Sequence, residues 1–146
     1  MANIYGKSMI DLEKFMLDHC KQLCEYAANE VYEAINYFLD QYYSEWKPAT
    51  YQRTYEFLHS AFKTDIKKVG NGYEIEVGID YESLDDYENA TGFEVVSYAN
   101  QGLHGGLDVN TNTHVWDDAI DSTIESGQLL ADCIIFLKSR GLTVIG

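Results

Sequence analysis

The stretch from Thr50 to Asp80 constrains the fold most, because helical, turn and strand patterns follow one another within it. Apolar residues first recur at the spacing of one face of an amphipathic helix, at Tyr51, Tyr55, Leu58 and Phe62. Further along, apolar and polar residues alternate as in a strand with one buried face, the apolar ones being Tyr73, Ile75, Val77 and Ile79. The stretch therefore predicts a helix that leads into a β-hairpin.

The turn of this hairpin is predicted from the pairing of side chains. A two-residue loop of Asn71 and Gly72 sets Ile66 opposite Val77, so that apolar side chains share one face. A three-residue loop would instead set Ile66 opposite Glu76, because a slip of one residue moves every side chain to the other face. Asn-Gly also tolerates the positive φ angles of a type I′ turn, so we predict that these two residues form the loop.

The chain length and composition favour one ordered domain over residues 1–146. Hydrophobic residues make up 46% of the 146 residues, and there is one proline. No apolar run approaches the roughly 20 residues that cross a membrane. Polar and charged residues interrupt the first apolar residues, unlike a secretory signal, so we expect synthesis and initial retention in a cytoplasm.

The acidic composition restricts the partners that we expect. The formal net charge of −14 repels nucleic-acid backbones and anionic membrane surfaces. We therefore predict no direct sequence-specific nucleic-acid binding and no membrane partner.

A long N-terminal helix is predicted over about residues 8–43. Ser8, with Asp11 three residues later, has the pattern of a helix N-cap. The predicted buried stripe of this helix consists of Leu12, Met16, Cys20, Leu23, Ala27, Val31, Ile35, Phe38 and Tyr42. Such a helix spans on the order of 50 Å, which exceeds the diameter of a domain of this size. We therefore expect another subunit to cover part of the stripe.

The remaining segments complete an α+β fold, in which the long N-terminal helix and C-terminal helices pack on a small antiparallel β-sheet. The helix and hairpin occupy about residues 50–80, and a solvated acidic loop follows over 80–92. A third strand is predicted over residues 93–99, because their composition is rich in residues that favour strands. C-terminal helices are predicted over about 113–140, interrupted at Gly127, with a short strand over 142–145.

Residues 108–119 resemble the start of a calcium-binding loop but do not complete it. Asp108, Asn110 and Asn112 alternate as oxygen ligands do. The sixth position is then Thr113 where a glycine is needed, and the twelfth is Ala119 where a bidentate glutamate belongs. We therefore expect no calcium site here.

Other candidate sites are also incomplete. His19 points away from Cys20 and Cys24 on a helix, so these residues do not form a zinc site. We expect all three cysteines, including Cys133, to be buried apolar side chains. His104 begins a His-Gly-Gly sequence like that of an esterase oxyanion loop, but the chain has no G-x-S-x-G sequence for the nucleophile. We predict no enzyme, no catalytic residue and no cofactor or metal.

The tyrosine-rich end of the first helix is the predicted interface. Tyrosine and other aromatic side chains are enriched where proteins contact one another. We expect the aromatic residues near the end of this helix to be partly exposed in a monomer and covered in an assembly. The candidate interface residues are Tyr37, Phe38, Tyr42, Tyr43, Trp46, Leu103 and His104.

The order of these elements resembles a family of tailed-bacteriophage proteins. The resemblance extends from about Asp11 to Arg140. It is carried by the long helix, the segment Tyr42-Tyr43 to Pro48, the stretch Tyr51-x-Arg53-Thr54-x-x-x-Leu58-x-x-Ala61, the loop Gly102-Leu103-His104-Gly105-Gly106, and Trp116. The family is that of tail-completion or head-tail joining proteins, which are minor tail components.

This resemblance implies a virion structural protein with an α+β fold that forms a ring where the tail meets the head. It implies copies of itself and neighbouring tail or connector proteins as partners, with no catalytic residue. The implied location is the virion, and the host cytoplasm during assembly. The family's usual proline and Asp-Thr-Gly are replaced here by Lys47-Pro48-Ala49-Thr50, and the acidic loop is longer.

The acidic charge also leaves a second function open. A DNA-mimic inhibitor would place carboxylates in rows to occupy the DNA site of a DNA-binding or DNA-cleaving enzyme. Four acids of the long helix are spaced by seven or eight residues and are able to form such a row, namely Asp18, Glu25, Glu33 and Asp40.

Overall fold

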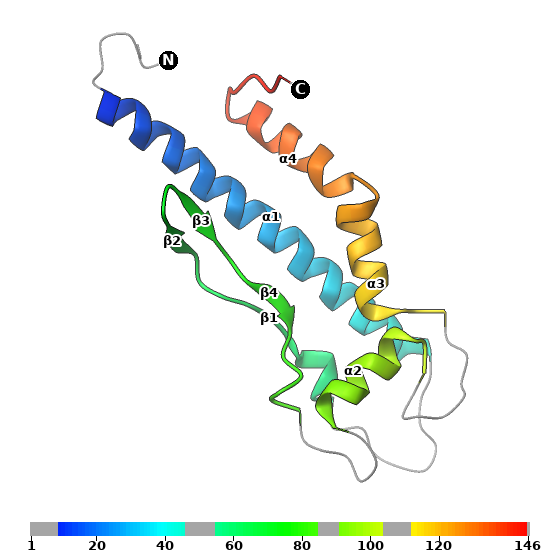
Figure 1. Ribbon diagram of the computed structural model, residues 1–146. Coiled ribbons are helices and arrows are strands. Elements are labelled where there is room, and N and C mark those ends of the chain that lie inside the picture. The colour runs from blue at the N-terminus through cyan, green and yellow to red at the C-terminus, as the bar shows by residue number, and fades with distance from the viewer. Residues whose placement is uncertain (1–8, 46–54, 85–90, 104–111, 146) are drawn as a thin grey trace.

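The structure is a computed structural model that describes residues 9–45, 55–84, 91–103 and 112–145, with side chains of the first helix described from Lys14 onward. One long helix, α1 (Met9–Glu45), runs the length of the molecule (Figure 1). Short β-strands lie along one side of it and the C-terminal helices along the other. This arrangement confirms the predicted α+β fold.

The observed bounds of α1 agree with the predicted helix over 8–43, but its stripe is buried only in the second half. Ile35 and Leu39 are fully buried. Met16, in contrast, is 51% exposed, and Cys20 is also exposed, so the prediction that these two are buried is wrong. The reason is that the buried core gathers around the second half of the helix.

The helix predicted before the hairpin is much shorter within the described residues. Only Phe57–His59 are helical there, as a single 3-10 turn, η2. Tyr55 has a φ of 62°, a left-handed conformation that an α-helix does not contain. Phe62 belongs to a strand rather than to a helical stripe. The prediction of a regular helix is therefore wrong from Tyr55 onward, while residues 50–54 lie outside the described part.

Two short antiparallel ladders form the predicted hairpin. Strand β1 (Ala61–Lys63) pairs with β4 (Val77–Ile79), and β2 (Lys67–Val69) pairs with β3 (Gly72–Glu74). The loop consists of Gly70 and Asn71, because Val69 lies opposite Gly72. Gly70 has a φ of +57°, as the first loop position of a type II′ turn requires. The predicted loop of Asn71 and Gly72 is therefore wrong by one residue.

A β-bulge explains why the predicted pairing failed. Residues 64–66 of the first segment lie between the two ladders, opposite only residues 75–76 of the second. The Thr64 N–H donates to the Glu76 carbonyl at 2.9 Å, and the Glu76 N–H donates to Thr64 Oγ1 at 2.9 Å. An extra residue in one strand shifts the alternation of its side chains. Ile66 therefore does not lie opposite Val77, which pairs with Lys63.

Residues 93–99 form a helix rather than the predicted strand. Helix α2 spans Gly92–Asn100 and begins with a capping box. The Thr91 N–H donates to Glu94 Oε2 at 2.8 Å, and the Glu94 N–H donates to Thr91 Oγ1 at 3.3 Å. These bonds satisfy backbone groups that a helix start leaves open, and they outweigh the β-rich composition.

The C-terminal region is helical, as predicted for 113–140. It consists of α3 (Val115–Ile120), the π-helical segment η3 (Asp121–Glu125) and α4 (Gln128–Ser139). Gly127 separates the last two elements with a φ of +78°. Glu45, at the end of α1, accepts hydrogen bonds from the Thr113 N–H and Oγ1 just before α3. Residues 142–145 form no strand, so that prediction is wrong.

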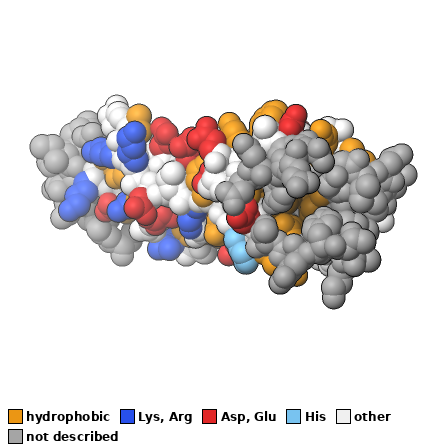
Figure 2. Space-filling view, turned by 90° about the horizontal axis from the view of Figure 1, so that it is seen from below, with side chains coloured by type: hydrophobic (Ala, Val, Ile, Leu, Met, Phe, Trp, Pro, Cys, Tyr) orange, Lys and Arg blue, Asp and Glu red, His pale blue; other side chains and the backbone are white. Residues whose placement is uncertain are grey.

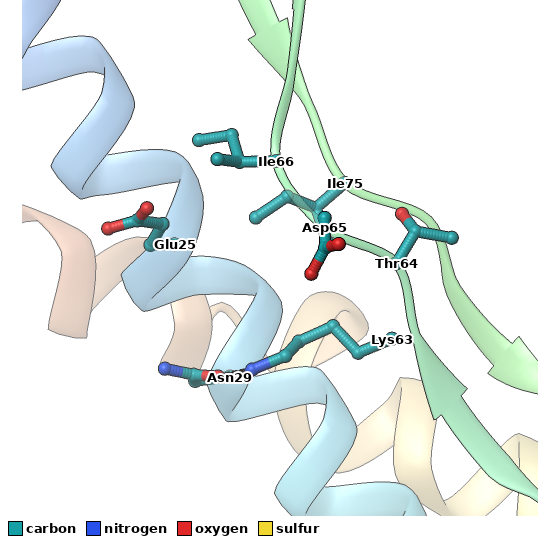
Figure 3. A pocket seen from close by; sticks show the side chains of 7 residues that line it. All are labelled: Glu25, Asn29, Lys63, Thr64, Asp65, Ile66 and Ile75. Atoms are coloured by element: carbon teal, nitrogen blue, oxygen red, sulfur yellow. Dashed lines mark hydrogen bonds between the residues drawn. The ribbon is translucent and has the colours of Figure 1, made fainter.

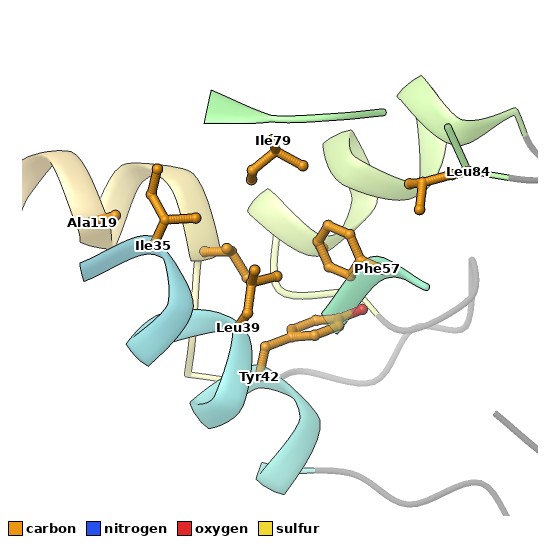
Figure 4. Packing of buried hydrophobic residues seen from close by; sticks show 9 residues of the cluster. Ile35, Leu39, Tyr42, Phe57, Ile79, Leu84 and Ala119 are labelled. Atoms are coloured by element: carbon orange, nitrogen blue, oxygen red, sulfur yellow. The ribbon is translucent and has the colours of Figure 1, made fainter. Parts of the chain in front are cut away.

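The core gathers around the second half of α1 (Figure 4). It joins the second half of α1 to η2, β4, the segment before α2, α2 itself and α3. Its members are Ile35, Leu39, Tyr42, Phe57, Ile79, Leu84, Ala99, Val115 and Ala119. Helix α4 contributes no buried residue. At the opposite end, with the β2–β3 hairpin and α4, the apolar side chains are half-buried or exposed.

Candidate functional surfaces

The predicted interface residues are partly core residues in the structure. Tyr42 is buried, and its hydroxyl donates to the carbonyl oxygen of Leu103 at 2.7 Å. The expectation that Tyr42 is exposed in a monomer is therefore wrong. Phe38 is half-buried against the core, whereas Tyr37 is exposed beside it, with ring centroids 5.0 Å apart. Trp46 and His104 lie outside the described residues.

An aromatic cluster holds the end of α1 against the segment before β1. The rings of Tyr42 and Phe57 meet edge to face at 5.8 Å, and those of Tyr43 and Tyr55 stack at 5.8 Å. Tyr43 therefore packs against the core of its own chain, while the Tyr55 side chain remains partly exposed to solvent. The structure therefore uses Tyr42, Tyr43 and Leu103 in internal packing, and among the described members of the set Tyr37 faces solvent.

A cleft of about 440 Å³ lies between α1 and the bulged part of the hairpin (Figure 3). Its charged lining consists of Glu25, Lys63 and Asp65. Lys63 Nζ donates to Asn29 Oδ1 and lies 5.5 Å from the centroid of the Tyr32 ring. The lysine thus links β1 to α1 across the cleft. Among the described residues, no group of three or more His, Cys, Asp or Glu side chains is arranged to hold a metal ion.

Three side chains, Cys24 and Tyr26 of α1 and Cys133 of α4, have a raised pKa. Burial, with Glu25 and Glu74 nearby, raises the pKa of the Cys24 thiol. Burial and the charge of Glu30 raise the pKa of Cys133 in the same way. A hydrogen bond to Glu30 raises the pKa of Tyr26 to about 12. A thiol reacts as a nucleophile through its thiolate, so Cys24 and Cys133 are poorly suited to that role.

In the described part of the chain, Lys and Arg occur toward one end of the molecule, whereas Asp and Glu occur at both ends. The hairpin end comprises residues 14–27, 63–76 and 128–140, and the loop end comprises residues 28–45, 55–60, 77–84, 91–103 and 112–125. All described Lys and Arg side chains belong to the hairpin end, where acids also occur; they are Lys14, Lys21, Lys63, Lys67, Lys68, Lys138 and Arg140. Figure 2 shows Lys and Arg gathered toward one end on the face in view.

The loop end carries only acids among its described Lys, Arg, Asp and Glu residues. They are Glu30, Glu33, Asp40, Glu45, Glu56, Asp80, Glu82, Glu94, Asp117, Asp118, Asp121 and Glu125. The same end has an exposed aromatic pair, because Tyr81 and Phe93 meet edge to face with ring centroids 5.5 Å apart. We call Asp80, Tyr81, Glu82, Phe93 and Glu94 the acidic aromatic patch.

The sequence carries a signal for this separation that the total charge conceals. Three lysines occur between residues 63 and 68, and the next Lys or Arg after Lys68 is Lys138. The intervening segment supplies most of the loop end. The positions of Lys and Arg along the sequence therefore indicate this uneven distribution of charge, whereas the net charge of −14 does not.

The helices in the described part of the chain do not reach the combination of length and hydropathy that a membrane crossing needs.

Neither the curated proteins nor the solved structures include a match to this chain. The sequence model of one protein family, YomN, matches residues 8–139, a range that includes every helix and strand described above. The chain therefore belongs to the YomN family, which derives from Bacillus phages and marks it as a phage-associated protein.

Proposed function

We propose that this chain is a structural protein of a tailed-phage particle, a tail-completion or head-tail connector component that assembles as a ring. Its partners are then further copies of the chain and neighbouring tail or connector proteins. Its location is the virion, and the host cytoplasm during assembly. Membership of a phage-derived family supports the phage setting, and the resemblance of the elements to tail-completion proteins supports the position in the particle.

The state of α4 is the observation that carries this proposal. The helix packs on α1, but none of its residues is fully buried, and Leu129, Ile134, Phe136 and Leu137 are half-buried. Leu130 is 66% exposed and Ile135 is 64% exposed. A helix that is apolar on most sides is normally covered by other protein, and large exposed apolar surfaces mark interaction sites. An assembled particle supplies such a cover.

The charges on the first half of α1 disfavour the row of four acids that a DNA mimic would use. Glu25, one of the four acids proposed to form a row, lines the cleft against the hairpin. Lys21 stands between Asp18 and Glu25 in the same half of α1. A mimic of DNA needs an uninterrupted series of negative charges, because a Lys or Arg there would repel the basic residues of its target.

The first test measures the mass of the purified protein by native mass spectrometry over a range of concentrations. We expect a wild-type oligomer of more than two subunits. The double change Leu130→Ser and Ile135→Ser should weaken it at least about tenfold, because truncating central apolar contacts has effects of this size. The matched control is Ile145→Ser, which removes an exposed apolar side chain outside α4 and should assemble as wild type. A wild-type protein that stays monomeric at every concentration would contradict the proposal.

A further inference from the structure

We propose that copies of this chain join head to tail, with the β2–β3 hairpin of one copy docked on the acidic aromatic patch of the next. This inference rests on the proposed function, since it names one contact between copies in the ring, in addition to the contact that α4 makes. It commits to a second copy of the chain as the occupant of both surfaces.

Strand β2 of the hairpin offers two lysines and a valine, with Glu74 of β3 opposite Lys67. Lys67, Lys68 and Val69 are all exposed and form the whole of β2. Among the described residues, β2 pairs with β3 alone, so its other edge lacks a strand partner. A two-stranded hairpin is only marginally stable in isolation, and further contacts at such an edge stabilise it. The hairpin therefore has both the chemistry and the open edge of a docking element.

The patch offers an acidic and aromatic surface that is already ordered. Phe93 is 60% exposed and projects from the first turn of α2, which the capping box fixes. Gly92 lets this turn approach Tyr81 closely, because a Cβ on Gly92 would lie 2.1 Å from the Tyr81 carbonyl oxygen. The side chain of Asp80 accepts from the Ser83 N–H at 3.2 Å and holds the turn that carries Tyr81 and Glu82. A surface fixed in this way loses little conformational entropy on binding.

The two surfaces match in charge and in apolar content. A lysine ammonium group is attracted to an aromatic face within about 6 Å, and Phe93 and Tyr81 present such rings. The carboxylates of the patch oppose the two lysines, and Val69 supplies an apolar contact for Phe93. The hairpin tip and α2 lie toward opposite ends of α1 (Figure 1), so one copy does not satisfy both of its own surfaces. Contacts between two different surfaces repeat from copy to copy, and they close into a ring when the rotation permits.

Two variants that each remove one surface test the arrangement by native mass spectrometry. The hairpin variant carries Lys67→Glu and Lys68→Glu, and the patch variant carries Tyr81→Ala and Phe93→Ala. Each alone should associate at least about tenfold more weakly than wild type, because each lacks one half of the contact. Mixed in equal amounts, they should form a one-to-one dimer that neither variant forms alone at the same concentration, since one intact hairpin then meets one intact patch.

The control for net charge is the double change Lys14→Glu and Lys21→Glu, which alters the charge equally at exposed positions of α1, outside both the hairpin and α4. It should assemble as wild type, and circular dichroism should show the helical content of wild type in all variants. If wild type assembles and either surface variant assembles equally well, or if the mixture forms no dimer, the head-to-tail contact is overturned while the proposed function stands. If wild type never assembles, both are overturned.

Discussion

Replacing Gly92 by alanine is expected to destabilise the protein by about 2 kcal/mol or more, because overpacking at a site without free space forces the backbone to move. The new Cβ would lie 2.1 Å from the Tyr81 carbonyl oxygen and 3.0 Å from the Leu84 Cβ. Leu84 is itself part of the buried core, so it has little room to shift. Urea unfolding followed by circular dichroism measures the change.

The sign of this effect is informative, because alanine otherwise stabilises a helix relative to glycine by about 1 kcal/mol. The matched control is Gly72→Ala, whose Cβ would meet only the Val69 carbonyl oxygen at an ordinary 3.9 Å. That change should alter the free energy of unfolding by no more than about 0.5 kcal/mol. A Gly92→Ala protein as stable as wild type would show that α2 does not pack closely on the segment before it.

Replacing Leu39 by alanine is expected to lower the free energy of unfolding by about 2–5 kcal/mol, the usual range for removing a fully buried leucine. Leu39 is 0% exposed and belongs to the cluster in which α1 meets Phe57 and Ile79. The loss combines the transfer of the side chain to water with the cavity that it leaves. Thermal and urea unfolding both report it.

Met16→Ala on the same helix is the control for Leu39→Ala. Met16 is more than half exposed, so its truncation should change stability by no more than about 0.5 kcal/mol. Equal losses at the two positions would mean that the first half of α1 is covered in the monomer. That result would remove the basis for an open hairpin end.

Local patterns in the sequence predict those elements that depend on local physics. The apolar period of α1 predicts a helix that differs from the observed Met9–Glu45 by only one or two residues at each end. The change of period near Tyr73 predicts the hairpin. Pairing within the hairpin was not predictable from alternation, because the bulge at residues 64–66 adds one residue to a single strand. Alternation specifies a register only while both strands are continuous.

The strand predicted over 93–99 is wrong because two local signals in the sequence conflict there. The helix-start signal determines the structure, and the strand composition does not. Thr91 and Glu94 have the spacing of a capping box, and their two hydrogen bonds start α2. The composition of Phe93 to Val96 is typical of a strand. Cap hydrogen bonds satisfy specific backbone groups, whereas strand composition acts only when a neighbouring strand is available.

The candidate interface was less predictable than the fold, because exposure depends on what packs against each side chain. Tyr42 and Tyr37 are both tyrosines near the end of one helix, yet Tyr42 is buried by Phe57 and Leu103 while Tyr37 faces solvent. The hydrophobic residues of α4 predict a helix with a buried face, and nothing in their spacing reveals that Leu130 and Ile135 stay exposed while the helix packs on α1. The sequence shows that no Lys or Arg occurs between Lys68 and Lys138. Whether that segment forms one acidic end of the molecule depends on where the fold places it.

The most direct test of a structural role in the particle is to quantify this protein by mass spectrometry in purified particles of the phage that encodes it. A ring at the head-tail junction predicts that the protein remains with intact particles through density-gradient purification, at a fixed copy number greater than two. Its absence from the particles would contradict the structural role. Recovery instead in a one-to-one complex with a DNA-cleaving enzyme of the host would establish the DNA-mimic function in its place.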